Sequence, residues 1–418
     1  MATLAHANGH IPQDGAFDST FALKLDPYRF IARRCPRLGS DVFETRILLQ
    51  RAYCMTGPEA AALFYDRSLF RRHGAAPLRL QATLFGKGGV QTLDGPAHVN
   101  RKGVFLSVMT PESIRRLGEL SEAQWHAAAA RWRGTGTLEL YREAREVLCR
   151  AVCEWAGVPL RDGEVRLRTS QLTLLFDTAG SMGPRHWSGR FARAGAEQWA
   201  GLLIEQARRG VIKPAAESAL HAVAFHRDLS AHLLDAQIAA VELLNVLRPT
   251  VAVAVFVVFA AHALHLHPEW RTRILQDGSG DSMHLFVQEV RRFYPFFPSV
   301  LAETCKEFEW RGMRFDAGIR TILDLYGTDH DARTWEAPDE FRPERIRNWK
   351  PNPYTLIPQG GGDTQRDHRC PGEWITLELM KRATWFLANA DYTLPPQDLE
   401  IDMQRLPALP KSRLLISV

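Results

Sequence analysis

Apolar side chains recur every three or four residues along most of the chain, which is the spacing of one face of an α-helix. Clear examples of this spacing lie within residues 42–53 and within residues 120–132. The longest helical pattern covers residues 233–266 and is interrupted only by Pro249. The spacing therefore predicts helices in these three stretches and a mainly α-helical protein.

The pattern changes after residue 303, where short alternating apolar runs lie on either side of Gly312 and predict a β-hairpin. Five prolines between residues 338 and 358 mark an extended, irregular segment that ends in three consecutive glycines at 360–362. After Cys370, Pro371 can open a helix, and apolar residues at 375, 379, 383 and 386 continue it. The coarse prediction is a helical body with small β-sheets.

The first twenty residues are polar and contain Pro12 and Gly15, so we expect a loose N-terminal tail over residues 1–20. No Pro-rich or Gly/Ser-rich linker divides the rest of the chain. We therefore expect one large domain over residues 21–418.

Composition narrows the class of protein. The chain has 418 residues, of which 45% are hydrophobic and 24% charged, as is typical of globular proteins. Lysines and arginines exceed acidic residues by 52 − 47 = 5 but are scattered, which gives no case for nucleic-acid binding. The longest apolar run, residues 251–261, is too short to cross a bilayer, so we expect no membrane anchor and a cytoplasmic location. None of the six cysteines forms a CxxC pair, which favours free thiols.

Cys370 lies in a glycine-rich turn, between His368-Arg369 and the helix that Pro371 begins. A helix N-terminus and neighbouring cations favour a thiolate and should lower the thiol pKa. A buried structural cysteine, a redox-active thiol and a thiolate metal ligand are all compatible with this position. A lone thiolate suits an axial haem ligand, because the porphyrin supplies the other four donors.

Three motifs around this cysteine resemble those of the cytochrome P-450 superfamily. Residues 286–292 contain a Glu-x-x-Arg pair, residues 341–346 read Phe-Arg-Pro-Glu-Arg-Ile, and residues 358–373 contain the glycines and Cys370. The resemblance implies a mainly α fold in which haem b is sandwiched between a long kinked central helix and a C-terminal Cys loop. It implies that Cys370 ligates the haem iron. It further implies that an ion-pair triad supports the haem loop, formed by Glu289, Arg292 and Arg345.

The centre of the longest predicted helix points to one family within the superfamily. Residues 245–250 read Asn-Val-Leu-Arg-Pro-Thr, where most members of the superfamily carry an acid–alcohol pair that delivers protons. This Arg-Pro sequence, with residues 84–86 (Leu-Phe-Gly) and Gln91, is similar to the bacterial fatty-acid peroxygenase family. That resemblance implies hydrogen peroxide as the oxidant, a fatty acid as the substrate, and no redox partner protein.

Arg248 can also be interpreted from its neighbours alone. It interrupts an apolar run, and burial of an unpaired guanidinium costs several kcal/mol, so it needs an anion. The positions three and four residues away hold no acidic side chain. Either a carboxylate from another helix or the carboxylate of a ligand can supply the charge. Pro249 should kink the helix here and open a pocket.

Together these residues predict a peroxide-driven hydroxylase of long-chain fatty acids, with Arg248 and Pro249 at its catalytic centre. The substrate carboxylate on Arg248 takes the place of the missing acid and directs oxidation to Cα or Cβ. Gln91 favours hydroxylation, because relatives biased toward terminal alkenes carry His there and a neutral amide cannot transfer a proton. Phe85 is expected to contact the acyl chain.

The resemblance also suggests which residues meet the haem and its propionates: His98, Lys102, Arg72 and His368. Three other functions stay open. They are a fatty-acid decarboxylase giving terminal alkenes, a monooxygenase dependent on redox partners, and a non-catalytic haem or fatty-acid binding protein.

Overall fold

The computed structural model describes residues 9–418, and helices make up most of its ordered elements. The helices are α1 (Thr20–Leu25), α2 (Phe30–Arg37), α3 (Pro58–Phe64), α4 (Leu78–Leu80), η1 (Gln81–Phe85), η2 (Val90–Thr92), α5 (Gly95–Val108), α6 (Pro111–Trp132), α7 (Leu140–Trp155), η3 (Asp162–Glu164), α8 (Val165–Asp177), α9 (Pro184–Arg208), α10 (Ala219–Phe225), α11 (Ala236–Ala252), α12 (Ala254–Leu266), α13 (Pro268–Gln276), α14 (Asp281–Phe293), α15 (Leu325–Asp329), α16 (Arg345–Asn348) and α17 (Glu373–Asn389). The strands are β1 (Val42–Ile47), β2 (Gln50–Met55), β3 (Phe70–Arg71), β4 (Thr137–Glu139), β5 (Ser299–Thr304), β6 (Phe308–Trp310), β7 (Met313–Phe315), β8 (Arg320–Asp324) and β9 (Leu415–Ser417). The predicted mainly α fold with small sheets is confirmed.

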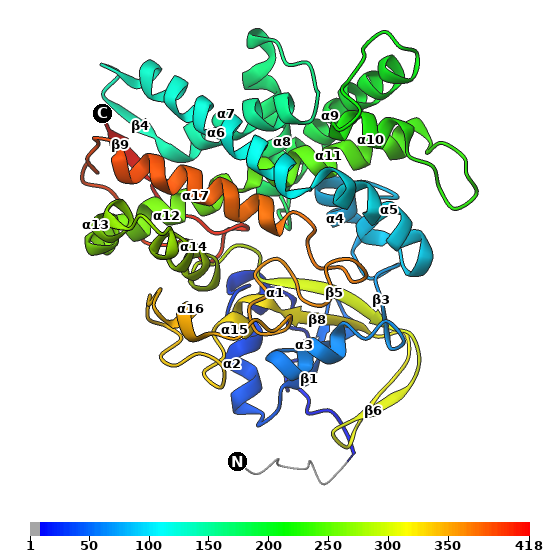
Figure 1. Cartoon of the computed structure of the whole chain (residues 1–418). Helices are drawn as coiled ribbons and strands as arrows, with labels where there is room; N and C mark the ends of the chain where they lie inside the picture. Colours follow the sequence, from blue (N-terminus) through cyan, green and yellow to red (C-terminus); the bar gives the residue numbers. More distant parts are fainter. Residues whose placement is uncertain (1–8) are drawn as a thin grey trace.

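The helical body surrounds α11 and α12, which pack against α7, α8, α9 and α17 (Figure 1). Helix α6 shows why this body forms. Thr110 caps its N-terminus, and its predicted apolar face buries Trp125 and Trp132 against Phe386 of α17. Residues 236–266 are long and apolar enough to cross a membrane by composition, but 94% of the most apolar stretch is buried inside the protein. This is the environment of a core helix.

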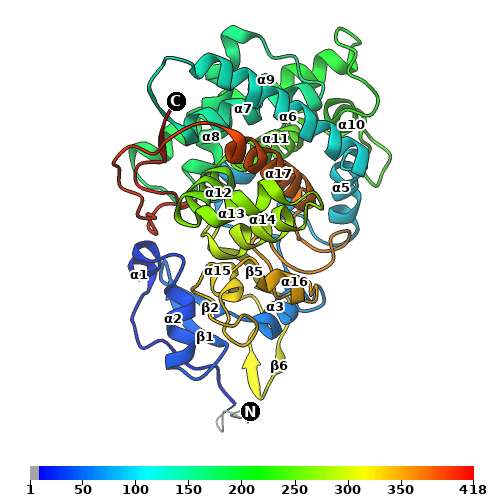
Figure 2. The same ribbon diagram turned by 60° about the vertical axis from the view of Figure 1, so that its left-hand side comes forward.

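A mixed sheet with the strand order β1-β2-β8-β5-β3 lies at the other end of the molecule, beside α2 and α3 (Figures 1 and 2). Strands β2 and β8 are parallel, and the other neighbours are antiparallel. The predicted hairpin around Gly312 is present as β6 and β7. Strand β9, near the C-terminus, pairs with β4, which lies between α6 and α7.

The helix predicted over residues 42–53 is wrong, because this stretch forms the β1–β2 hairpin. Burial along β1 alternates over its second half, with Thr45 and Ile47 inside and Arg46 exposed. The reversal occurs at Leu48 and Leu49, which both adopt positive φ. Pairing of β2 with β8, about 270 residues later in the chain, completes the backbone hydrogen bonds and overrides the local helical spacing.

The segment expected as a loose tail is held against the sheet from Ile11 onward. Ile11 is buried, the Asp14 N–H donates to the Glu44 carbonyl at 2.9 Å, and Arg34 pairs with the Asp14 carboxylate at 2.8 Å. Helix α1 begins at Thr20. Residues 1–8 lie outside the described part of the chain.

The central helix is broken, but the break lies four residues beyond Pro249. Pro249 continues α11, and the break falls at Val253, whose N–H donates to the Thr250 carbonyl rather than four residues back. The expected kink therefore separates α11 from α12 one turn beyond the proline.

Candidate active site

Cys370 ends a tight loop that three glycines shape. Gly360 and Gly362 adopt positive φ, and a Cβ on Gly361 would lie 2.7 Å from the Pro353 carbonyl oxygen. The Tyr65 hydroxyl accepts a hydrogen bond from the Gly361 N–H at 2.8 Å. The Cys370 N–H donates to the Gln359 carbonyl, which closes the loop just before α17.

Burial raises the pKa of the Cys370 thiol, which corrects the expected lowering. The side chains expected to help the thiolate are engaged elsewhere: Arg369 pairs with Glu373 at 2.7 Å, and His368 stacks on His98. The Gly372 N–H, Lys102 and Arg291 oppose the effect of burial only in part. The protein therefore presents a partly buried sulfur that gains from a cationic partner such as a metal centre.

A second buried ion pair braces this loop and was not predicted. Arg291 on α14 bonds to the Glu373 carboxylate at 2.5 Å and to the Gln359 side chain at 3.1 Å. Gln359 in turn places its amide nitrogen 3.8 Å from the Cys370 sulfur. Arg291 directly precedes the Arg of the Glu-x-x-Arg pair, so adjacency to that motif was the only available signal.

Glu289, Arg292 and Arg345 meet behind the loop. Arg292 binds both carboxylate oxygens of Glu289 at 2.8 Å, and Arg345 reaches the same carboxylate at 3.2 Å. Arg292 also donates to the carbonyls of Asp329 and Pro338, so the triad ties α14 to the irregular segment before the Cys loop. Bidentate geometry and these extra hydrogen bonds satisfy the buried charges.

Four basic side chains gather beside the Cys loop: Arg72, His98, Lys102 and His368. Burial lowers the pKa of Lys102 to about 8, of His98 to about 4 and of His368 to about 3, and it also lowers the pKa of Arg72. Lys102 donates to the Arg369 carbonyl at 2.8 Å, and His368 lies 3.7 Å from Asp94. For each of these four side chains, burial lowers the pKa more than the neighbouring carboxylates raise it. A dianionic group such as the two haem propionates would therefore fit the cluster.

Arg248 lies on α11 with its guanidinium buried, and within residues 9–418 no carboxylate comes within 4.0 Å of it. Its Nη2 donates to the Asn245 side chain at 3.1 Å, and its Nε has no partner. Burial lowers the pKa of Arg248 to about 9; Arg193 adds to this effect, and Cys370 opposes it. The sequence left two sources of negative charge open, a carboxylate from another helix and the carboxylate of a ligand. The described residues do not supply the first.

The partners of Arg248 form a buried polar chain that was missed apart from Gln91. The Asn245 amide donates to Glu242 at 3.0 Å and to the Gln91 side chain at 3.3 Å. Glu242 is fully buried and pairs with Arg101 of α5 at 2.8 Å. A glutamate in a helix is usually exposed to solvent, so the residue type gave no signal. Glu242 is buried because α11 lies in the centre of the helical body.

Phe85 ends η1, is partly buried and packs against the core; its contact with an acyl chain stays a prediction. The buried Arg193 of α9 contacts the same turn, because its Nη1 lies 3.4 Å from the Leu84 carbonyl oxygen. Among the residues that the structure describes, its Nη2 has no hydrogen-bond partner. Arg193 also forms an ion pair with Glu197, and its charge adds to the lowering of the pKa of Arg248.

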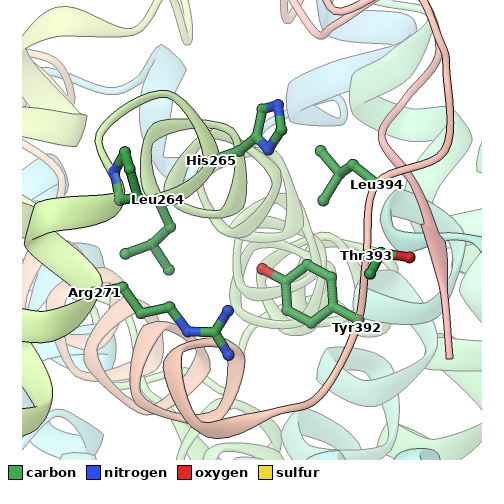
Figure 3. A pocket seen from close by; sticks show the side chains of 7 residues that line it. Leu264, His265, Arg271, Tyr392, Thr393 and Leu394 are labelled. Atoms are coloured by element: carbon green, nitrogen blue, oxygen red, sulfur yellow. The ribbon is translucent and has the colours of Figure 1, made fainter.

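A surface cavity of about 280 Å³ lies apart from these residues, between α12, α13 and the segment after α17 (Figure 3). Its lining includes Arg271 and Tyr392. Arg271 donates to the carbonyls of Ala388 and Ala390 at 2.8 and 2.7 Å, and so closes the C-terminal end of α17. The Arg271 side chain thus serves the fold. The lining of the cavity contains none of the predicted site residues.

Comparisons with known proteins agree with this arrangement. A family model described as Cytochrome P450 matches residues 283–417. Cytochrome P450 71D18 of Mentha gracilis is 30% identical over 130 residues, which is 29% of this chain and 25% of the relative. Cytochrome P450 3A15 of Cavia porcellus is 33% identical over 125 residues, or 29% and 24% of the two chains. The matches thus span about a quarter of the length of these curated relatives.

Three solved structures match nearly the whole chain, each with a TM-score of 0.94. A variant of cytochrome P450SP alpha (CYP152B1) is 52% identical and covers 96% of this chain and 98% of its own. Cytochrome P450EX alpha (CYP152N1), solved with myristic acid, is 44% identical with coverage of 97% and 98%. A variant of cytochrome P450 OleT in complex with arachidonic acid is 34% identical with coverage of 98% and 99%.

The fold, the Cys370 sulfur and the basic cluster beside it define a haem-thiolate protein whose cofactor is haem b. The chain belongs to the cytochrome P450 family, in the CYP152 group that these structures represent.

Proposed function

We propose that this protein uses hydrogen peroxide to hydroxylate long-chain fatty acids at Cα or Cβ. The observation that carries the proposal is the buried guanidinium of Arg248, which has no carboxylate partner within residues 9–418 and lies close enough to Cys370 for that sulfur to affect its pKa. A fatty-acid carboxylate satisfies the charge and the free Nε in one bidentate contact. Solved neighbours with myristic and arachidonic acid support this choice of substrate.

Haem held by Cys370, with its propionates among Arg72, His98, Lys102 and His368, supplies the iron that activates peroxide and oxidises the C–H bond. The activation step needs a group that accepts and returns a proton within hydrogen-bond reach. Helix α11 offers no acid at this level. Thr250 does not replace it, because its hydroxyl donates to the Val246 carbonyl at 3.0 Å.

The substrate carboxylate therefore fills the acid–base role. Arg248 binds one or both of its oxygens, and Asn245 holds the guanidinium in place. An oxygen of the carboxylate then takes the proton from peroxide and gives it back. Since the head group is fixed, the neighbouring carbons Cα and Cβ are the ones presented for oxidation, while the acyl chain extends toward Phe85.

Gln91 lies within reach of Asn245 and carries no titratable proton. This supports hydroxylation over loss of the carboxylate as an alkene. Because the oxidant is a small molecule, the protein requires no redox partner protein.

The test is turnover of a long-chain acid by the haem-loaded enzyme with hydrogen peroxide alone, with products analysed by gas chromatography. We expect Arg248→Ala to lose on the order of 100-fold in kcat/KM and Arg248→Lys to retain part of the activity. Arg209→Ala, which changes an exposed arginine at the C-terminal end of α9, is the control. A carbon-monoxide difference spectrum confirms haem loading in each variant.

Full activity of Arg248→Ala, or turnover only with a reductase system, would overturn the proposal. Acid binding without any product would instead identify a fatty-acid binding protein.

A further inference from the structure

A buried carboxylate stands at the far end of the polar chain that reaches Arg248. Glu242 lies on α11 three residues before Asn245, and its side chain is fully buried. Its Oε1 accepts a hydrogen bond from Nη1 of Arg101 on α5 at 2.8 Å, and its Oε2 accepts one from the Asn245 amide at 3.0 Å. The two carboxylate oxygens are therefore both used, one by a cation and one by a neutral amide.

The chemistry of these partners fixes the direction of the Asn245 side chain. An ionised carboxylate only accepts hydrogen bonds and a guanidinium only donates them, whereas an amide does both. The atom that faces Glu242 is therefore the amide nitrogen, and the atom that faces Arg248 is the amide oxygen. The two contacts are 3.0 Å and 3.1 Å long, so each end of the amide is held by a group that tolerates only one orientation.

The same constraint extends to Gln91 on η2. Nδ2 of Asn245 also donates to Oε1 of Gln91 at 3.3 Å, so the Gln91 oxygen is turned toward α11. Gly89 permits this close approach, because a Cβ added there would lie 3.0 Å from Nδ2 of Asn245 and 3.1 Å from Oε1 of Gln91. Within residues 9–418 the Gln91 amide nitrogen makes no hydrogen bond. Gln91 is thus left with a donor, and not an acceptor, to offer a ligand.

An ion pair is not needed merely to hold α5 against α11. Removal of water from two charges can offset their attraction, and apolar side chains of similar volume often stabilise a fold equally well. Burial raises the pKa of Glu242, and the contacts with Asn245 and Arg101 oppose this effect. The orientation that a charged acceptor imposes on Asn245 explains the pair better than stability does.

The resulting donors suit the acid of the proposed function. Among the described residues Nε of Arg248 has no partner, and both Arg248 and Gln91 contact Asn245. An ionised carboxylate accepts through two oxygens and donates through neither. A neutral alcohol of the same length has one oxygen and must place its own proton, so it gains less from two fixed donors.

We propose that the Arg101–Glu242 ion pair positions the acid site: through Asn245 it turns Arg248 and Gln91 so that both offer N–H groups to the substrate carboxylate. Arg101 and Glu242 are positioning residues, since they act through Asn245. This inference rests on the proposed function for the identity of the acid, but it concerns binding, which is measured without peroxide.

The test is titration of the haem-loaded full-length protein with myristic acid and, separately, with 1-tetradecanol, followed by the haem absorption spectrum. The main variant is Arg101→Met/Glu242→Met, which removes the acceptor and keeps the net charge. We expect its affinity for the acid to fall by about three- to tenfold, the effect of one hydrogen bond, while its affinity for the alcohol stays the same. Thermal melting shows whether the variant is folded. Glu242→Gln keeps the shape but can donate as well as accept, so it should lose acid affinity in the same direction and replaces a double variant that does not fold.

A double-mutant cycle separates positioning from a purely structural role. In an Asn245→Leu background the two Met substitutions should cause no further loss of acid affinity, because the contact through which they act is gone. The matched control is Glu143→Gln on α7. Glu143 also accepts from an arginine, Arg142, and from a neutral N–H, that of Trp132, and this variant should bind acid as the unchanged protein does.

Equal losses for acid and alcohol, a further loss in the Asn245→Leu background, or an unchanged affinity for the acid would overturn the proposal. Acid binding with the expected losses but without peroxide turnover would fail the proposed function alone. Absence of acid binding by the unchanged protein would overturn both.

Discussion

The side-chain oxygen of Asn245 accepts a hydrogen bond from Nη2 of Arg248 at 3.1 Å. This contact orients a buried cation without neutralising it, because an amide carries no charge. The Asn245 nitrogen is fixed in turn by Glu242 and Gln91, so the direction of the amide is determined by its neighbours. Arg248 is thereby held ready for an external anion.

The charge at position 245 should decide whether substrate binds. Asn245→Asp places a carboxylate against the guanidinium, and we expect it to compete with the fatty acid and weaken binding by about 10- to 100-fold. Asn245→Leu removes the orienting contact without adding charge and should cost less. Titration of each haem-loaded variant with a long-chain acid, followed by the haem absorption spectrum, measures both. Tighter binding by the Asp variant than by the Leu variant would contradict this role.

A titratable group at position 91 should change the products. Histidine can exchange a proton near neutral pH whereas glutamine cannot, so Gln91→His should raise the proportion of terminal alkene. Gas chromatography of peroxide-driven reactions gives the ratio of alkene to hydroxy acid. Gln91→Leu is the control for lost hydrogen bonding, and an equal rise of alkene in that variant would rule out proton exchange as the cause.

The triad behind the Cys loop should be needed for both stability and haem retention. Glu289→Gln leaves the fully buried Arg292 without a charged partner, which typically costs about 3–5 kcal/mol. We expect a lower melting temperature and a smaller carbon-monoxide signal per protein. Glu344→Gln, an exposed glutamate nearby in the chain, should leave both unchanged. An unaltered melting temperature for Glu289→Gln would show that the pair contributes little.

Asp324 should make stability depend on pH. It caps α15 through the Gly327 N–H at 2.7 Å, but burial raises its pKa from 3.8 to about 7. The folded state therefore keeps a proton that the unfolded state loses, and stability falls as pH rises from about 4 to about 7, by at most about 4 kcal/mol.

Asp324→Asn keeps the cap and cannot ionise, so its free energy of unfolding should not show this decline. Urea unfolding of both proteins at pH 4.5, 6 and 7.5 checks the difference between them. Parallel pH curves would mean that Asp324 is ionised at little cost.

The elements that sequence reasoning predicted well have local causes. Helix α6 has a capping threonine and a single apolar face, and both act over a few residues. Helix α17 places its predicted positions Ile375, Leu379, Ala383 and Phe386 inside for the same reason. In residues 42–53 the local spacing was misleading, since the outcome depends on pairing with β8 far along the chain.

For the ionisable groups, too, local features could be predicted from the sequence, whereas contacts between distant segments could not. The absence of an acid near Arg248 within its own helix was evident from the chain, but the lack of one from other helices was not. Glu242, Arg291 and Glu373 look like ordinary surface charges until the helices that bury them are assembled. The thiol of Cys370 was expected to acidify, yet burial dominates, because Arg369 pairs with Glu373 and burial lowers the pKa of His368 to about 3.

The sequence by itself determined the helical class, the order of the three motifs around Cys370, and the isolation of Arg248 among apolar residues. These features follow from the spacing and chemistry of neighbouring residues. Only the tertiary structure decided which strands pair, which charges find partners and which guanidinium is left without one. Those outcomes depend on contacts between distant segments, and on the removal of water that makes each such contact matter.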